Sequence, residues 1–331
     1  MNRCRSLLID QCEEGFSSRA LRALTNGRKA NFIMSFSRKD LNLSAVNSSG
    51  LRTLSISGVQ DKVGLVLNKG VFSLAESASR YILKPVPSLD TVRFRSDIPA
   101  NEHLTMQIAG QLCGIETAPN ACVRMSDGEE AYLVKRFDYH GDEKIRQEDF
   151  AQLLSRSEET HGKNYKYDCS YEEAAGAIRR FCPAHRIEMP KFFRIVVFNY
   201  LFGNGDAHLK NFSMYETVNG DYVLTPAYDL LNTSLHIPSE SPLALDLFSE
   251  GYYTPSFEAL GFYSRADFEE FADRIGVRKK VAFDILDEFG ELGNEVVNMV
   301  ARSFLSDAAK EAYVTLFEDR RKAIRNKGIA R

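Results

Sequence analysis

The sequence predicts an α+β fold with two lobes, in which a small β-rich lobe precedes a larger, mostly helical lobe. Short segments rich in β-branched and aromatic residues occur between residues 63 and 139, and helical periodicity dominates from residue 147 onward. The chain has 331 residues, of which 44% are apolar, so a large core divided between two units is expected. We expect residues 1–137 to form the small lobe, with residues 1–50 as a distinct N-terminal segment, and residues 138–331 to form the helical lobe.

The small lobe is expected to combine a sheet with two helices. The segments "VGLVL", "GVFSLA" and "RYILKPVPS" predict three strands, and "AYLVKRFDY" (131–139) predicts a fourth. A short helix is expected over Ser17–Leu24. A longer helix begins at Pro99, a residue that suits the first helical turn, and ends at Gly114.

The second lobe shows helical patterns throughout, with one interruption. The segments "QEDFAQLLSR", "YEEAAGAIRRF", "MPKFFRIVVFNYLFG" and "RADFEEFADRIG" predict helices, as do "KKVAFDILDEFGELGNEVVNMVARSFL" and "DAAKEAYVTLFEDRRKAIR". The segment "VNGDY" predicts a hairpin with an Asn-Gly turn. Polar residues gather near the join of the two lobes, which is the expected place for an active-site cleft.

Composition excludes several classes of function. The net charge of −3 argues against a direct nucleic-acid surface, because phosphate binding usually shows as a basic excess; a local basic patch stays open as an alternative. The richest apolar run, "FFRIVVFNYLFG", is too short to span a membrane and contains Arg194. The N-terminus has too brief an apolar patch for a signal peptide. The six cysteines form no zinc-like spacing, so we expect free thiols and a cytoplasmic location.

The segment "LFGNGDAHLKNFSMY" (201–215) carries the strongest chemical signal. Asp206 and Asn211 follow an apolar helix, and Asp229 follows in "TPAYDLL", where we expect it to end a strand. Two carboxylates and an amide supply the oxygen ligands that Mg²⁺ prefers. Their order along the chain is that of a phosphotransferase, in which Asp206 accepts the substrate's hydroxyl proton while Asn211 and Asp229 hold the metal.

Two upstream segments complete a nucleotide site. Lys84 lies near the end of a strand, from which a lysine can reach nucleotide phosphates, and Glu102 at the head of the next helix is its expected partner. The segment "SISGVQDK" provides Ser57, Gly58 and Lys62 in a turn whose backbone N–H groups can approach an anion. This turn matches neither of the common glycine-rich phosphate motifs.

Taken together, these segments resemble the HipA-like serine/threonine kinases, which are toxins of bacterial toxin–antitoxin systems. The resemblance runs from about residue 55 to the end, through "SISGVQDK", "ILKP", "NEH", "VKRFD", "QEDF", "GNGDAHLKNFS" and "PAYDLL" in that order. It implies a two-lobed protein-kinase-like fold, ATP and Mg²⁺ as cofactors, and Asp206 as the catalytic base. It also implies regulation by autophosphorylation at Ser55, with Ser57 as a second serine in the same motif.

The resemblance also implies a set of ATP-binding residues. These are Ser57, Gly58, Val59, Gln60, Asp61, Lys62, Lys84, Lys135, Arg136, Phe137, His208, Leu209, Lys210, Asn211, Tyr228 and Asp229. Known substrates of the family are aminoacyl-tRNA synthetases, whose phosphorylation would halt charging and growth.

Two departures favour a particular branch of the family. Full-length members carry roughly a hundred residues, about one small domain, before the serine-glycine loop. This chain has only about fifty there, and they are dissimilar. Many full-length members also have a small apolar residue where this chain has Ser57. Both features resemble the short HipT branch, which implies a HipS-like small protein and a HipB-like helix-turn-helix protein as partners.

Two other functions remain open from the sequence. A small-molecule phosphotransferase on the same scaffold would share Asp206, Asn211 and Asp229 but would not require the "SIS" motif. A nucleotide-binding pseudokinase in a repressor complex is the third alternative, and the retention of Lys84 with the other three residues argues against it.

Overall fold

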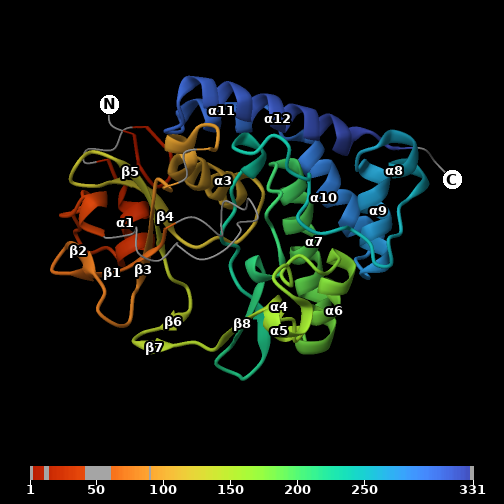
Figure 1. Cartoon of the computed structure of the whole chain (residues 1–331), viewed down its shortest axis with the longest axis horizontal. Helices are drawn as coiled ribbons and strands as arrows, with labels where there is room; N and C mark the ends of the chain where they lie inside the picture. Colours follow the sequence, from red (N-terminus) through yellow and green to blue (C-terminus); the bar gives the residue numbers. More distant parts are fainter. Residues whose placement is uncertain (1–2, 11–14, 42–60, 89–90, 329–331) are drawn as a thin grey trace.

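The computed structural model describes residues 3–10, 15–41, 61–88 and 91–328. Figure 1 shows a sheet-containing unit at one side of the molecule and a helical unit at the other, with the long helix α12 (Asp307–Arg325) running along one edge. Ser55, Ser57, Gly58, Val59 and Gln60 lie outside the described residues, so the expected phosphate loop stays a prediction.

The small lobe is built on a five-stranded antiparallel sheet with strand order β2-β1-β3-β5-β4. Its strands are β1 (Val63–Asn68), β2 (Val71–Leu74), β3 (Tyr81–Pro85), β4 (Asn120–Arg124) and β5 (Glu130–Lys135). The turn between β1 and β2 has positive φ at Lys69 (48°) and Gly70 (82°), which is the backbone of a tight hairpin turn. A Cβ on Gly70 would lie 2.9 Å from the carbonyl oxygen of Lys29, so a glycine fits best there.

One sheet face has its own apolar core. Leu65, Phe72, Leu83 and Leu133 pack there with Leu24 from α1 (Ser18–Thr25). The segment before β1 also contains the 3₁₀ helix η1 (Arg38–Leu41).

Helix α3 (Ile98–Leu112) joins the two halves of the molecule. It follows the 3₁₀ helix η3 (Arg95–Asp97), and its first twelve residues are all buried. The helix packs against β4 and β5 on one side and against α11 (Asn294–Arg302) on the other. Twelve successive buried residues make α3 a core element although several of them are polar, and the helix carries Glu102 into the interior.

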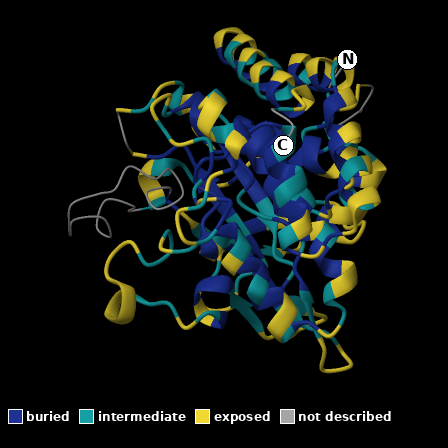
Figure 2. Ribbon diagram, turned by 90° about the vertical axis from the view of Figure 1, so that its right-hand side faces the viewer, coloured by how far each residue is buried: buried dark blue, intermediate teal, exposed yellow. Residues whose placement is uncertain are grey.

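The second lobe surrounds helix α7 (His185–Leu201), which packs against α6, α10, α12 and β10. Its sheet has the order β10-β9-β8. The other elements of this half are β6 (Tyr139–His140), β7 (Glu143–Lys144), β8 (Gln147–Asp149), α4 (Phe150–Leu153), α5 (Glu158–His161), α6 (Tyr171–Phe181), η4 (Leu209–Asn211), β9 (Ser213–Glu216), β10 (Tyr222–Leu224), η5 (Thr233–Leu235), α8 (Pro255–Leu260), α9 (Arg265–Arg274) and α10 (Lys279–Glu291). Figure 2 shows buried residues lining the inner faces of these helices and exposed residues on their outer faces.

Several local expectations from the sequence are wrong. The segment from Gln147 begins as strand β8, and only Phe150–Leu153 is helical. Helix α4 starts there because Asp149 is its N-cap and forms a capping box with Gln152. The continuous helix expected from residue 279 breaks into α10 and α11 at Leu292–Gly293. Strand β4 was not expected, because its residues carry little β-branched or aromatic signal.

Candidate active site

A buried ion-pair cluster joins three distant parts of the chain. The Nζ of Lys84, on strand β3, lies 2.5 Å from Glu102 Oε1 on α3 and 2.5 Å from Asp229 Oδ1. The side chains of Lys84 and Glu102 are only 4% and 1% exposed. The Lys84–Glu102 pair expected from the sequence is therefore present, and Asp229 forms a second pair with the same ammonium group.

The electrostatics of this cluster fix its charges. Burial opposes the charge of Lys84, but Asp229 and Glu102 outweigh burial, so the pKa of Lys84 is raised. Burial also opposes the charge of Asp229, yet Lys84 and Lys62 hold the pKa of Asp229 well below its usual range. Burial raises the pKa of Glu102 despite the pull of Lys84. Asp229 is therefore the carboxylate that holds its negative charge most firmly.

The polar loop, residues 202–208, follows the end of α7. Asn204 Nδ2 donates to Asn199 Oδ1 at 2.9 Å, and Gly205 N donates to Thr233 Oγ1 at 2.8 Å. A Cβ on Gly205 would collide with the carbonyl oxygen of Ser241 and with the side chain of Glu240. This close approach explains why the sequence needs glycine immediately before Asp206.

Asp206 is buried at the centre of this loop. Its Oδ1 accepts a hydrogen bond of 2.5 Å from the hydroxyl of Tyr167. Beside the loop, burial raises the pKa of Glu240 to about 7. Asp206 thus shares its surroundings with a second carboxyl group, while a hydroxyl donor holds one of its own oxygens.

Asp206, Asn211 and Asp229 surround one small hollow of about 10 Å³. Its full lining is Lys84, Glu102, Asn204, Asp206, Asn211, Asp229, Leu231 and Thr233. Asn211 Nδ2 lies 3.4 Å from Asp229 Oδ2, and Asp229 has a positive φ of 54°, a conformation that is uncommon for a residue other than glycine. Strained backbone of this kind is concentrated at functional sites.

The donor set of this hollow fits a small divalent cation. Asn211 Oδ1 and Glu102 Oε2 are both buried and have no hydrogen-bond partner within the described residues. Unsatisfied buried oxygens require an explanation, and a cation next to Asp229 would supply one. Within the same residues no cluster of three or more His, Cys, Asp or Glu side chains could hold a metal. A carboxylate from Asp229 and an amide oxygen from Asn211 are nevertheless donors that fit Mg²⁺, which binds through one or two carboxylates together with phosphates and water.

A larger cavity of about 290 Å³ adjoins the hollow and shares Lys84 and Asp229 with it. Its volume is close to the lower limit for small-molecule sites. The expected ATP-binding residues that line it are Lys62, Lys84, Lys135, Arg136, Phe137, Lys210, Tyr228 and Asp229. The rings of Phe137 and Tyr228, with centroids 5.8 Å apart, come from the two lobes and meet at this cavity.

The structure does not bring every expected ligand into these cavities. Asp61 pairs with Arg38 at 3.4 Å, and Leu209 is fully buried in the apolar core. His208 is buried against the ring of Tyr167, and burial lowers the pKa of His208 to about 4, so its imidazole is neutral. None of these three side chains lines either cavity.

Two further residues of the site, Asp149 and Tyr167, were not predicted from the sequence. Asp149 lines the larger cavity and pairs with Lys210 at 3.2 Å. The sequence signal that could have drawn attention to Asp149 is its place as the N-cap of α4. Tyr167 had no local signal, because its contact with Asp206 spans 39 residues.

The fold and the geometry of this site define the class of the protein. HipA of Shewanella oneidensis, solved as a toxin–antitoxin complex with HipB and operator DNA, superposes with a TM-score of 0.63 at 22% identity and covers 83% of this chain and 65% of its own. The Helicobacter pylori proinflammatory kinase CtkA gives a TM-score of 0.52 at 17% identity and covers 84% and 93%. The protein therefore has the two-lobed α+β fold of the protein-kinase-like class.

The family is shown by sequence. Residues 54–296 match the HipA-like C-terminal domain, and the chain belongs to that family. A Haemophilus influenzae protein, named as a kinase by inference, is 30% identical over 326 residues, with 92% of each chain covered. The serine/threonine-protein kinase toxin HipA of Shewanella oneidensis is 28% identical over 218 residues, which are 61% of this chain and 48% of that toxin. The chain thus matches about half the length of this toxin.

Proposed function

We propose that this protein is an ATP- and Mg²⁺-dependent serine/threonine protein kinase that acts as the toxin of a toxin–antitoxin system. The observation that carries the proposal is the convergence of Lys84, Glu102 and Asp229 with Asp206 and Asn211 around one hollow, beside a cavity that opens to the lobe junction. Kinases need these groups together: a lysine–glutamate pair, a metal-binding Asp and Asn, and a separate Asp for the substrate hydroxyl.

The roles follow from the positions of the side chains. Lys84, held by Glu102, would bind the nucleotide phosphates, while Lys135, Arg136 and Phe137 would line the nucleoside end of the larger cavity. Asn211 and Asp229 would hold Mg²⁺, which when bound neutralises charge on the phosphates.

The transfer step involves Asp206. Asp206 would accept the hydrogen bond of the substrate hydroxyl as the hydroxyl oxygen forms its bond to the γ-phosphorus and the bond from that phosphorus to the β–γ bridging oxygen breaks. The hydroxyl proton passes to Asp206, and ADP leaves. Catalysis then depends on how well Asp206 is positioned.

The branch and partners belong to the same proposal. The second serine of the "SIS" motif, Ser57, resembles the HipT branch, and the HipA structure that this fold matches is a complex with HipB; both support a HipS-like small protein and a HipB-like protein as partners. An aminoacyl-tRNA synthetase is the proposed substrate, in the cytoplasm, with DNA contact only through the complex. No helix within the described residues is both long and apolar enough to cross a membrane.

Ser55 and Ser57 are the proposed sites of regulatory autophosphorylation. A phosphate on either serine would add about two negative charges to the loop that we expect to bind the ATP phosphates. The double replacement Ser55→Asp and Ser57→Asp should weaken ATP binding about tenfold, or about 1.4 kcal/mol, in calorimetry. The double replacement by Ala, which removes the hydroxyls without adding charge, is the control. Equal ATP affinity of the two double variants would contradict the off-switch role.

Expression in a bacterial host with a susceptible target tests the toxin function. The wild-type chain alone should slow growth, whereas Asp229→Asn should not, because the variant loses a charge needed for the metal. Equal growth of cells that express equal amounts of the two proteins would contradict the toxin assignment.

A further inference from the structure

A segment far upstream of the polar loop supports Asp206 and its neighbours. Three hydrogen bonds join this segment to the polar loop and the residue that follows it. Tyr167 Oη donates to Asp206 Oδ1 at 2.5 Å, and Tyr171 Oη donates to the Ala207 carbonyl at 2.8 Å. Leu209 N donates to the Lys166 carbonyl at 3.1 Å. The segment between α5 and α6, residues 162–169, together with the first turn of α6, is therefore bonded to residues 206–209 at three points.

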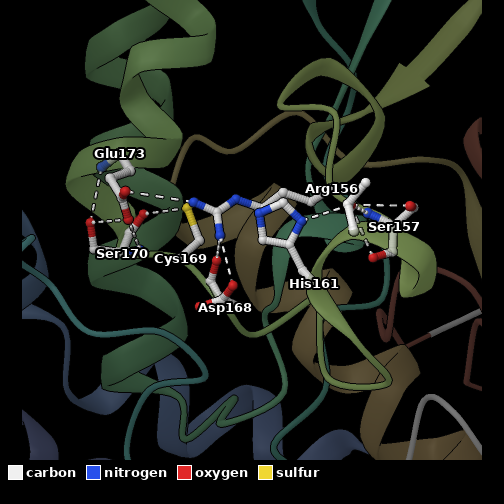
Figure 3. A network of polar contacts seen from close by, with 8 residues as sticks. Arg156, Ser157, His161, Asp168, Cys169, Ser170 and Glu173 are labelled. Carbon is white, nitrogen blue, oxygen red and sulfur yellow. Dashed lines mark hydrogen bonds and ion pairs between the residues drawn. The ribbon is translucent and has the colours of Figure 1, made fainter.

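Arg156 binds the end of this segment that leads into α6, as Figure 3 shows. Arg156 donates to the backbone carbonyl of Asp168, and its guanidinium lies 3.1 Å from the Asp168 carboxylate and 3.6 Å from that of Glu173. Glu173 in turn accepts from Ser170 N at 2.9 Å in the capping box of α6. Arg156 therefore ties the end of the segment, at the residue that follows Tyr167, to the first turn of α6.

The Tyr167 ring makes two contacts of its own. Its ring packs edge-to-face against His208, with centroids 5.1 Å apart, and the Lys166 Nζ lies 4.8 Å from its ring centroid. Aromatic and cation–π contacts of this kind fix the orientation of a ring. The hydroxyl is thus aimed at Asp206 by contacts that do not involve the carboxylate.

We propose that Tyr167 is a positioning residue for phosphoryl transfer, which holds the Asp206 carboxylate at the angle needed to receive the substrate hydroxyl. This inference rests on the proposed kinase function. The terminal torsion of an aspartate is soft, so the backbone alone does not fix the direction of its oxygens. A short hydrogen bond from a hydroxyl to a carboxylate is strong and directional, and it leaves further lone pairs to accept from substrate.

Tyr167→Phe tests this role, because it removes one hydroxyl and keeps the ring against His208. Transfer of phosphate from ATP should show a kcat roughly 10- to 100-fold lower, because displacements of about 1 Å at a reacting group cost that much. The KM for ATP should stay within about twofold, since Tyr167 lines neither cavity. Tyr200→Phe is the matched control: it removes a buried hydroxyl that donates to the Tyr263 carbonyl at 2.6 Å, and kcat should stay within about twofold.

A double-mutant cycle separates positioning from general damage. In the Asp206→Ala background, which has no oxygen to accept from Tyr167, Tyr167→Phe should change the residual rate less than about twofold, because its hydrogen-bond partner is already gone. If Tyr167→Phe does not fold, Arg156→Lys gives the same test. It weakens the contacts of residue 156 with Asp168 and Glu173, and it should lower kcat at unchanged KM.

The outcomes distinguish this inference from the proposed function. A folded wild-type chain that transfers no phosphate overturns the proposed function and this role with it. An active wild-type chain whose Tyr167→Phe variant is equally or more active overturns the positioning role alone. Multiplicative losses in the double variant would also overturn it.

Discussion

Replacing Asp206 by Asn should lower the rate of phosphoryl transfer about 10²- to 10⁴-fold, because the amide cannot accept the substrate's proton. The fold should survive, since asparagine has the same shape and its carbonyl oxygen can still accept from Tyr167. ATP affinity measured by calorimetry should change less than about twofold, because Asp206 lines only the smaller hollow.

A distant aspartate provides the control for this variant. Asp284→Asn alters an exposed residue of α10 whose charge is paired with Lys280 on the same helix, so its rate should equal that of the wild type. An Asp206→Asn variant that retains the wild-type rate would remove Asp206 from the catalytic role. Loss of rate together with loss of the thermal transition would show misfolding instead, and circular dichroism would detect it.

Replacing Lys84 by Met should abolish transfer and also destabilise the protein. The change leaves Glu102 and Asp229 buried around the position of the lost ammonium group, with Lys62 3.8 Å from Asp229 as the remaining cation. Removing one partner of a buried ion pair costs about 3–5 kcal/mol in the free energy of unfolding. Urea unfolding at pH 8 should show this loss as a lower midpoint.

The loss of stability in Lys84→Met should become smaller as the pH falls. In the wild type, Lys84 and Lys62 lower the pKa of Asp229, so the stabilisation that Asp229 contributes is present above its unfolded pKa and is lost only in acid. Without Lys84, burial should raise the pKa of both carboxyl groups in the folded state, so the variant should regain stability as they protonate. The difference between variant and wild type should therefore shrink from pH 8 to pH 5.

The double variant Lys84→Met with Glu102→Gln isolates the charge effect. It removes one of the two carboxylates that have lost the Lys84 ammonium group, so it should recover part of the stability and none of the transfer. Equal urea midpoints for wild type and Lys84→Met at pH 8 would contradict the buried cluster.

Helices with strong local signals could be predicted from the sequence. The bounds of α6 and α12 coincide with their predicted segments, because Ser170 and Glu173 form a capping box before α6 and Ser306 precedes the apolar periodicity of α12. The breaks in longer patterns could not be predicted. Helix α10 stops before Gly293 although apolar residues continue beyond it.

The candidate site, too, could be predicted only in part from the sequence. Lys84, Glu102 and Asp229 were predicted from their order along the chain, and the structure brings them within ion-pair distance. Asp229 was expected to end a strand, but β10 already ends at Leu224 and Asp229 has a left-handed backbone. Tyr167 could not be predicted, since only tertiary packing brings it to Asp206.

Incubation of the purified protein with [γ-³²P]ATP and Mg²⁺, followed by mass spectrometry of the labelled chain, tests the kinase assignment most directly. We expect phosphate on Ser55 or Ser57 of the wild-type protein and none on the Asp206→Asn variant. A folded wild-type protein that acquires no label, or equal labelling of the two proteins, would contradict it.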